Sequence, residues 1–445
     1  MPLIPLKIRP GVNTQFTGTL LEAGWLASQL IRFRNGLLQK IGGWAKATQT
    51  GFTGVCRGLH SWTQIDGLLD LGVGTHLKLW LYQLGSFYDL TPVQNSGTSA
   101  SSFFTTTSGS NLVGVAITSH GASTGDFYEA LTAASGGGVT IGGEYQVTVT
   151  DVNHFTIAAG TSATSNASFG SGVSWQLLLS IGQQDTVFEQ GYGSGPYGSG
   201  PYGESTGAGY AVLCRLWFLD NWGEFVLACP QNGGIYQWQP SSGTSTRATA
   251  LANAPTANAG ILVALPQQQV VAFGTNQGVS EQDPMLVAFS DVGDNTDWTA
   301  STTNQAGTYR LPRGSRIVGA LGSPLAILLW TNEGLWIMQY VGLPFVYSFT
   351  QVGFGCGLIA PKAAASTPFG VFWMESTGNF YSYNGSVAPV DCLVRDQVFG
   401  NINQAQANKI FAALNSAWNE IFWFYPSLDR GEIDSYVKYN YAEQL

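Results

Sequence analysis

Residues 58–93 have the sequence GLHSWTQIDGLLDLGVGTHLKLWLYQLGSFYDLTPV, the clearest local pattern in the chain. Short runs rich in aliphatic and aromatic residues alternate with turn signals at Asp66–Gly67, Thr75–His76 and Gly85. The pattern predicts four antiparallel strands joined by tight turns. Such a four-stranded meander is the unit of a β-propeller blade.

Similar units recur along the chain, each with an apolar strand, a polar turn and a strand rich in Trp or Tyr. They cover residues 213–238, 261–298, 317–351, 370–390 and 410–441. Turns near Asn276, Asn332, Gly378 and Asn419 are 56, 46 and 41 residues apart, and propeller blades repeat at about 40–50 residues. The sequence therefore predicts an all-β fold, a β-propeller of about six four-stranded blades with a small β-rich insertion domain. The alternative is a set of stacked β-sandwiches.

Composition divides the chain into five parts. Residues 1–54 form an N-terminal segment able to close the propeller and contact neighbouring subunits, and residues 55–93 form the first blade. Residues 94–178 form a Ser/Thr/Gly-rich β insertion, residues 179–210 a Gly/Tyr-rich interaction loop, and residues 211–445 the remaining blades. The last unit lacks a fourth strand, so either Phe33–Trp44 supplies it or the chain stops short of its natural end.

The overall composition excludes several classes of protein. Glycine accounts for 57 of 445 residues, charged residues for 10%, and the net charge is −9. This is too apolar for a disordered chain and too poor in Lys and Arg to bind nucleic acid by neutralising phosphates. We expect no secretory leader and no apolar run long enough to span a membrane. The five cysteines are odd in number and form no CxxC pair, which favours free thiols.

Two glycine motifs suggest chemistry that their context does not support. Residues 121–125 match GxSxG between His120 and Asp126; a nucleophile elbow needs a strong apolar strand before it and a helix after it, but this match lies in a low-complexity insert where abundant Ser and Gly favour a chance match. We therefore expect a turn. Two GxGxxG matches within residues 193–203 are by-products of a tandem repeat, since no helix follows to bind a pyrophosphate.

Carboxylates and histidines give no stronger signal. One acidic turn contains Asp291, Asp294, Asn295 and Asp297. Their oxygens could bind Ca²⁺, but their order does not match that of an EF-hand loop. Turns rich in Asp and Asn form without a metal, so we expect none here. A glycosidase needs two carboxylates that flank the glycosidic bond. The candidates are Glu333, Glu375 and Glu420, and nothing in the sequence indicates a second carboxylate beside any of them. The four histidines show no metal-site spacing. We predict no catalytic residue, no cofactor and no metal site. The abundant aromatic residues are expected to fill the space between blades.

The stretch GYGSGPYGSGPYG at residues 191–203 is a tandem repeat in which glycine and proline forbid a helix. Its tyrosines Tyr192, Tyr197 and Tyr202 are predicted to bind a partner subunit. The alternative is an exposed linker.

Several segments in their joint order resemble virion structural proteins of short-tailed bacteriophages, of the tail nozzle or hub type. They are RFRNGLLQKIGGW (32–44), CRLWFLDNWGEFVLACPQNGGIYQW (214–238), FSDVGDNTDWTASTTNQAGTYRLPRGSRIVGAL (289–321), WTNEGLWIMQYVGLPFVYSFTQVGFGCGLIAP (330–361) and FGNINQAQANKIFAALNSAWNEIFWFYPS (399–427). The GYGSGPYGSGPYG stretch and VTVTDVNHFTI (147–157) resemble pieces of those proteins too.

The resemblance implies a propeller subunit of a homo-oligomeric ring, a homohexamer, in the virion tail. The ring would assemble in the host cytoplasm and sit below the portal and its adaptor, the head–tail connector protein. It would also contact tail fibre or spike proteins, retain the packaged DNA, and pass the viral double-stranded DNA on ejection. A wall poor in Lys and Arg suits that role, because DNA could slide past it. Two alternatives remain: a propeller glycosidase or esterase acting on the host envelope, and a receptor- or glycan-binding tail protein.

Overall fold

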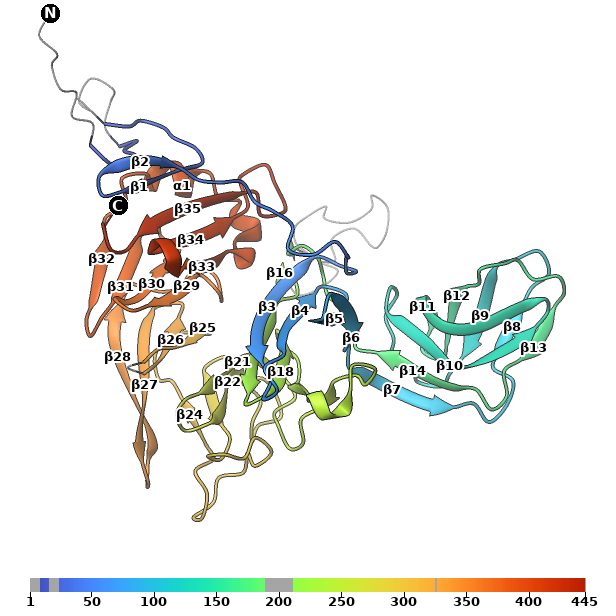
Figure 1. The fold of residues 1–445 in the computed structure, drawn as a ribbon. Helices are drawn as coiled ribbons and strands as arrows, with labels where there is room; N and C mark the ends of the chain where they lie inside the picture. The colour runs from blue at the N-terminus through green and yellow to red at the C-terminus, as the bar shows by residue number, and fades with distance from the viewer. Residues whose placement is uncertain (1–8, 16–23, 189–210, 325, 445) are drawn as a thin grey trace, which may run out of the picture.

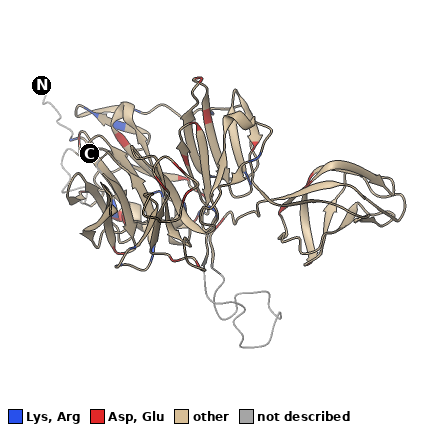
Figure 2. Ribbon diagram, turned by 90° about the horizontal axis from the view of Figure 1, so that it is seen from below, with Lys and Arg blue, Asp and Glu red and all other residues tan. Residues whose placement is uncertain are grey.

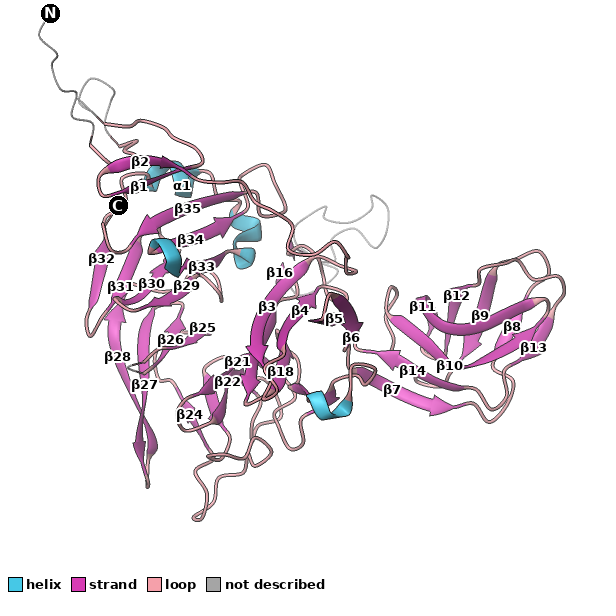
Figure 3. Ribbon diagram, viewed as in Figure 1, coloured by secondary structure: helices cyan, strands magenta, loops and turns pink. Residues whose placement is uncertain are grey.

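The computed structural model describes residues 9–15, 24–188, 211–324 and 326–444. They form a six-bladed β-propeller with a separate β-sheet module inserted after the first blade (Figure 1). Strands dominate, and the few helices are short (Figure 3). None of the helices in the described residues has the length and apolar character that crossing a membrane requires.

Each blade is an antiparallel sheet of consecutive strands, four in five blades and three in the last. Blade 1 contains β3 (Cys56–Thr63), β4 (Leu69–Thr75), β5 (Leu79–Gln83) and β6 (Ser86–Asp89). Blade 2 contains β17 (Trp217–Trp222), β18 (Phe225–Pro230), β19 (Tyr236–Trp238) and β20 (Thr249–Ala250). Blade 3 contains β21 (Asn258–Ala264), β22 (Gln269–Thr275), β23 (Leu286–Phe289) and β24 (Gly307–Arg310).

The remaining blades follow the same order. Blade 4 contains β25 (Ile317–Gly322), β26 (Ile327–Thr331), β27 (Gly334–Gly342) and β28 (Val346–Phe354). Blade 5 contains β29 (Ala364–Thr367), β30 (Gly370–Met374), β31 (Phe380–Tyr383) and β32 (Val387–Val390). Blade 6 contains β33 (Phe411–Asn415), β34 (Glu420–Tyr425) and β35 (Ser435–Asn440). The predicted propeller is confirmed.

One predicted spacing is wrong. Asn276, Asn332 and Gly378 each lie between the second and third strands of their blade, so their separations measure the true repeat. Asn419 lies between the first and second strands of blade 6. The last interval of 41 residues therefore compares turns that are not equivalent.

Aromatic side chains and glycines make the contacts between blades. The largest fully buried side chains include five tryptophans, which are Trp217, Trp298, Trp330, Trp373 and Trp423. This confirms that the aromatic residues form the core. Trp217 shows why the neighbouring blade carries glycine, because a Cβ added at Gly74 would lie 2.2 Å from Cγ of Trp217. Its indole nitrogen donates to the carbonyl oxygen of Thr75 at 2.7 Å. Blades 1 and 2 therefore meet at a tryptophan seated against glycine.

The inserted module has a sheet and a core of its own. Its strands are β7 (Val93–Thr98), β8 (Phe104–Thr106), β9 (Leu112–Ala116), β10 (Phe127–Gly136), β11 (Val139–Asp151), β12 (His154–Ala158), β13 (Ala167–Phe169) and β14 (Ser174–Leu178). They pair in the order β13-β8-β9-β12-β11-β10-β14-β7. Residues 113–117, 145–149 and 155–157 have strand-like sequences, and the structure confirms strands there as β9, β11 and β12. Figure 1 shows the module at the side of the propeller, beside blade 1.

The N-terminal segment does not supply the missing strand of blade 6, which corrects one expectation. Within the described residues, β1 (Ile31–Arg34) pairs only with β2 (Leu37–Lys40). Asn35 and Gly36 take the positive φ angles of 52° and 73° that a tight hairpin turn needs, so the segment folds back on itself. The hairpin still reaches blade 6 through side chains, because Arg32 donates to Glu420 at 3.0 Å.

Two segments have helical composition in the sequence, Glu22–Arg32 and Gln404–Asn415. The first suggests a short amphipathic helix, which is wrong over residues 24–32, where Trp25 forms an isolated bridge with Val12. The second suits either a helix or a strand, and it divides into a 3₁₀-helix, η2 (Gln404–Lys409), followed by β33. The other helical turns are α1 (Arg395–Gly400), η1 (Pro240–Ser242) and η3 (Ser416–Trp418).

Candidate interaction surfaces and the propeller axis

Lys362 joins three blades at the centre of the propeller. It lies directly before β29 of blade 5, and its ammonium group donates to the carbonyl oxygens of Trp217 and Arg57. These acceptors belong to the innermost strands of blades 2 and 1. Burial lowers the pKa of Lys362 from 10.5 to about 8. The centre of the ring is therefore crossed by a lysine that binds main-chain carbonyls.

The seam that closes the ring, between blade 6 and blade 1, is polar. Arg57 in β3 forms an ion pair with Glu432 at 2.7 Å, and Gln184 donates to the same carboxylate at 3.0 Å. Lys409, only 3% exposed, pairs with Asp185 and lies 3.6 Å from Glu432. Burial alone would raise the pKa of Glu432, but the hydrogen bonds from Arg57 and Gln184 outweigh burial and hold it below the ordinary value.

The predicted partner-binding tyrosines Tyr192, Tyr197 and Tyr202 lie outside the described residues. The base of that segment is described, where β15 (Val187–Phe188) pairs with β16 (Ala211–Val212). Thr186 exchanges two hydrogen bonds with Gln406 of blade 6, at 3.0 and 2.9 Å. The described base of this segment, β15 and β16, therefore lies at the closing seam.

The GxSxG match forms a turn between β9 and β10, as predicted. The buried Asp126 accepts a hydrogen bond from the Ser123 amide at 2.8 Å and another from the Ile181 amide at 2.9 Å. His120 accepts a hydrogen bond from the Ala122 amide through Nδ1, at 2.9 Å. The acid and the histidine therefore fix backbone groups and tie the module to the chain that leaves it.

The acidic turn after β23 is held by its own hydrogen bonds. Asp294 accepts from the backbone and the hydroxyl of Thr296, at 2.8 and 2.7 Å, and these bonds lower the pKa of its carboxyl group. Asp291 accepts from the amide of Gln305 at 2.7 Å. Asn295 donates to Gln237 and Asp297 accepts from Asn304. Within the described ranges, no group of three or more His, Cys, Asp or Glu side chains is placed to hold a metal ion.

The three glutamates considered as glycosidase carboxylates have separate local partners. Glu333 lies 3.4 Å from Arg313, Glu375 accepts from the Thr377 hydroxyl at 2.5 Å, and Glu420 pairs with Arg32. A groove of about 610 Å³ runs along blades 2 to 4, and Asp220 is the one carboxylate among its described lining residues. That carboxylate accepts from the Val263 amide at 2.7 Å. The groove thus presents no pair of acids.

All five cysteines are free thiols, as predicted. Three of them are buried, namely Cys214, Cys229 and Cys356, while Cys56 and Cys392 are half-buried. Burial raises the pKa of Cys229 far above that of an ordinary thiol.

Exposed apolar side chains on projecting hairpins are the surfaces that sequence reasoning missed. At the tip between β27 and β28, Phe345 is 78% exposed and Leu343 is 65% exposed. On the N-terminal segment, Trp44 is 76% exposed and Leu37 is 73% exposed. In the sequence analysis, Leu343 and Phe345 lie within the unit at residues 317–351, and Leu37 and Trp44 lie within the candidate strand Phe33–Trp44. The available signal for Leu343, Phe345 and Leu37 was their place at or beside a hairpin turn, where side chains pass beyond the sheet core.

Comparison with known proteins gives little guidance. No known family matches the sequence, and no curated protein matches it. Among solved structures, the chain is similar to phage phi92 endosialidase, with 12% identity and a TM-score of 0.23 over 84% of this chain. It spans about half of that protein's length, 51%. It is also similar to BBS1N from a complex with ARL6DN, with 11% identity and a TM-score of 0.33 over 87% of this chain and 94% of that one.

A third similar structure is AztD from Citrobacter koseri, with 9% identity and a TM-score of 0.29 over 85% of this chain and 80% of that one. At such identities and TM-scores, these similarities support no conclusion about function.

Proposed function

We propose that this chain is a non-catalytic structural subunit of a bacteriophage tail, of the nozzle or hub type. Copies assemble into a ring below the portal and adaptor, and the ring retains packaged DNA and conducts it on ejection. The proposal joins the resemblance of five sequence segments to tail nozzle proteins with the physical character of the molecular surface.

The observation that carries the proposal is the apolar surface on the projecting hairpins. Leu343 and Phe345 sit at the tip of the β27–β28 hairpin, which extends beyond the body of the propeller (Figure 1). Soluble monomers rarely present large exposed apolar patches, and such patches mark sites of protein contact. A subunit that is permanently packed against neighbours has this character.

The charge distribution supports the role in DNA passage. Lys and Arg are sparse over the whole ribbon (Figure 2), and they number 18 in 445 residues. Affinity for DNA grows with the number of phosphates that cations neutralise. A ring built from this chain would therefore let DNA slide without holding it.

The test is the mass of the protein in solution, alone and mixed with its adaptor, followed by electron microscopy of the product. We expect a ring, with neutral or acidic side chains lining its lumen. The double substitution Leu343→Asp and Phe345→Asp should abolish or weaken ring formation while the monomer stays folded. Val152→Asp, at an equally exposed apolar position of the inserted module, is the matched control.

A protein that stays monomeric in both conditions, or a lumen lined with Arg and Lys, would overturn the proposal. Release of sugars from host lipopolysaccharide or capsule would instead support a glycan-degrading tail protein. Equilibrium binding to the same glycans without cleavage would support a receptor-binding one.

A further inference from the structure

The inserted module meets the propeller at a two-stranded junction. The chain enters through Thr91–Pro92 and leaves through Leu179, whose amide donates to the carbonyl oxygen of Pro92 at 2.8 Å. In the described residues, the buried apolar side chains of the module form one cluster and those of blades 1 and 2 form another. Two adjacent strands between separate cores allow rotation, as in a hinge.

The module is acidic on the side that faces the propeller. Residues 79–214 contain no Lys and no Arg, so the module has no cation of that kind to pair with its own carboxylates. Glu129 in β10 stands directly opposite Glu144 in β11 in the strand register. Like charges at such a cross-strand position destabilise a sheet unless a cation lies between them.

The propeller supplies the cations. Lys78, between β4 and β5, is 4% exposed, and its ammonium lies 2.5 Å from Glu144 and 2.9 Å from Asp89. Arg247, before β20, lies 2.9 Å from Glu129 and 3.1 Å from Asp89. Two cations and one carboxylate of the propeller thus meet two carboxylates of the module.

The ion pairs of this cluster shift the pKa values of Asp89 and Arg247. Burial alone would raise the pKa of Asp89, but Arg247 and Lys78 outweigh burial and lower it. Burial alone would lower the pKa of Arg247, but Asp89 and Glu129 outweigh burial and raise it. Asp89 and Arg247 therefore stay charged at neutral pH.

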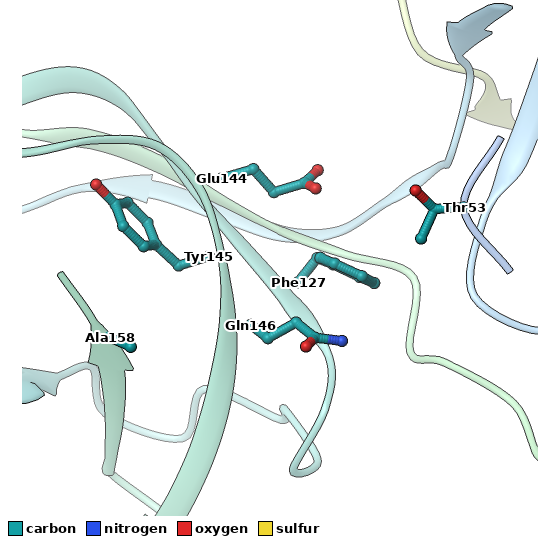
Figure 4. Close-up of a pocket in the computed structure, with 6 residues that line it drawn as sticks. All are labelled: Thr53, Phe127, Glu144, Tyr145, Gln146 and Ala158. Atoms are coloured by element: carbon teal, nitrogen blue, oxygen red, sulfur yellow. The ribbon is translucent and has the colours of Figure 1, made fainter. Parts of the chain in front are cut away.

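The junction beside this cluster is not tightly packed. Figure 4 shows Glu144 and Phe127 of the module on one side of a space and Thr53, before blade 1, on the other. The cavity measures about 470 Å³. Polar contacts therefore hold the module at this angle: the ion pairs of the cluster, and the hydrogen bonds that Asp126 accepts from Ser180 and Ile181 at 2.9 Å.

We propose that residues 93–178 form a hinged arm and that Lys78, Asp89, Glu129, Glu144 and Arg247 form a latch that holds it in the orientation seen here. Opening the latch separates two like-charged glutamates from two cations and exposes all four to water. The arm can then change its angle while its own core and that of the propeller stay intact.

The test is small-angle X-ray scattering of the full chain carrying Lys78→Met and Arg247→Met. We expect a broader distribution of interatomic distances, and chymotryptic cleavage after the half-buried Leu179 that is about tenfold faster. Near-UV circular dichroism should stay unchanged, because both cores remain folded. Arg310→Met is the matched control, since it breaks an ion pair with Asp283 inside blade 3 and should leave the scattering unchanged.

A second variant, Glu129→Gln with Glu144→Gln, keeps the test decisive if loss of the cations prevents folding. This variant removes the ion pairs of the latch and also the repulsion between the two glutamates. The inserted module should therefore stay folded while it becomes free to rotate relative to the propeller. Wild-type scattering and wild-type cleavage rates in whichever variant folds would overturn the proposal. Broadening in the control as well would also overturn it, because the effect would then not belong to the latch.

Discussion

Two contacts between blades in the same ring are stabilised by different interactions. One lies between blades 1 and 2, and the other, between blades 6 and 1, closes the ring. The first is a buried tryptophan, Trp217, seated against Gly74. The second is a set of ion pairs around Arg57 and Lys409. The first seam joins Trp217 to Thr75 across 142 positions of sequence, because the inserted module lies between the two blades. The closing seam joins residues 375 positions apart in the pair Arg57–Glu432, and charged groups there add directional specificity to the match.

Removing the tryptophan should have the largest effect. Trp217→Ala empties a fully buried site between blades and should lower the free energy of unfolding by about 3–5 kcal/mol. Trp44→Ala removes an exposed indole and should cost less than about 1 kcal/mol. Chemical denaturation of both variants measures the difference. Equal losses would show that the apolar seam is no more important than the surface.

At the seam between blades 6 and 1, the loss of stability should depend on whether the lysine or its carboxylate partners are removed. Asp185→Asn with Glu432→Gln leaves Lys409 buried and unpaired, which should cost about 3 kcal/mol or more. Lys409→Met leaves the half-exposed carboxylates to water and should cost about 1–2 kcal/mol. Thermal and denaturant unfolding of the two variants tests the order. A larger loss in Lys409→Met would contradict this account of the seam.

Lys362 should make the stability of the ring depend on pH. Its pKa falls from 10.5 to about 8 in the folded chain, so the unfolded chain binds more protons between those values. The contribution of Lys362 should therefore rise by about 1–3 kcal/mol as pH increases from 8 to 10.5. The measurement is the difference in unfolding free energy between wild type and Lys362→Met across this range. A difference that stays constant with pH would contradict the prediction.

An exposed ion pair should show the smallest effect. Arg310 lies 2.7 Å from Asp283 in blade 3, but its side chain is largely in water. Arg310→Met should change the unfolding free energy by about 0–1 kcal/mol. A loss as large as that of the closing seam would remove the distinction between buried and exposed charges.

The blades could be predicted because their signals are local. Residues 58–93 contain all four strands of blade 1 and their turns, and the structure places β3 to β6 there. The hairpin at Asn35–Gly36 was also within reach, because Asn-Gly between short apolar runs is a strong hairpin signal. The same segment could equally supply the missing strand of blade 6, because both a hairpin and an added strand need short apolar runs.

The axis and the seam could not be predicted. Lys362 binds the Arg57 carbonyl across 305 positions of sequence, and nothing around either residue marks the other. The opposed glutamates of β10 and β11 depend on a register that includes a bulge between Ala130 and Ala134. Sequence patterns fix the direction of strands better than their register, so such cross-strand pairs become visible only in three dimensions.

The absence of Lys and Arg between Leu79 and Arg215 has a practical consequence for protein chemistry. Trypsin, which cuts after those two residues, would leave the whole inserted module and the tyrosine-rich segment in one very large peptide. That peptide would escape routine mass-spectrometric mapping, so a tryptic digest of this protein would show only the flanking parts of the chain. A protease that cuts after aromatic residues or glutamate would recover the missing portion.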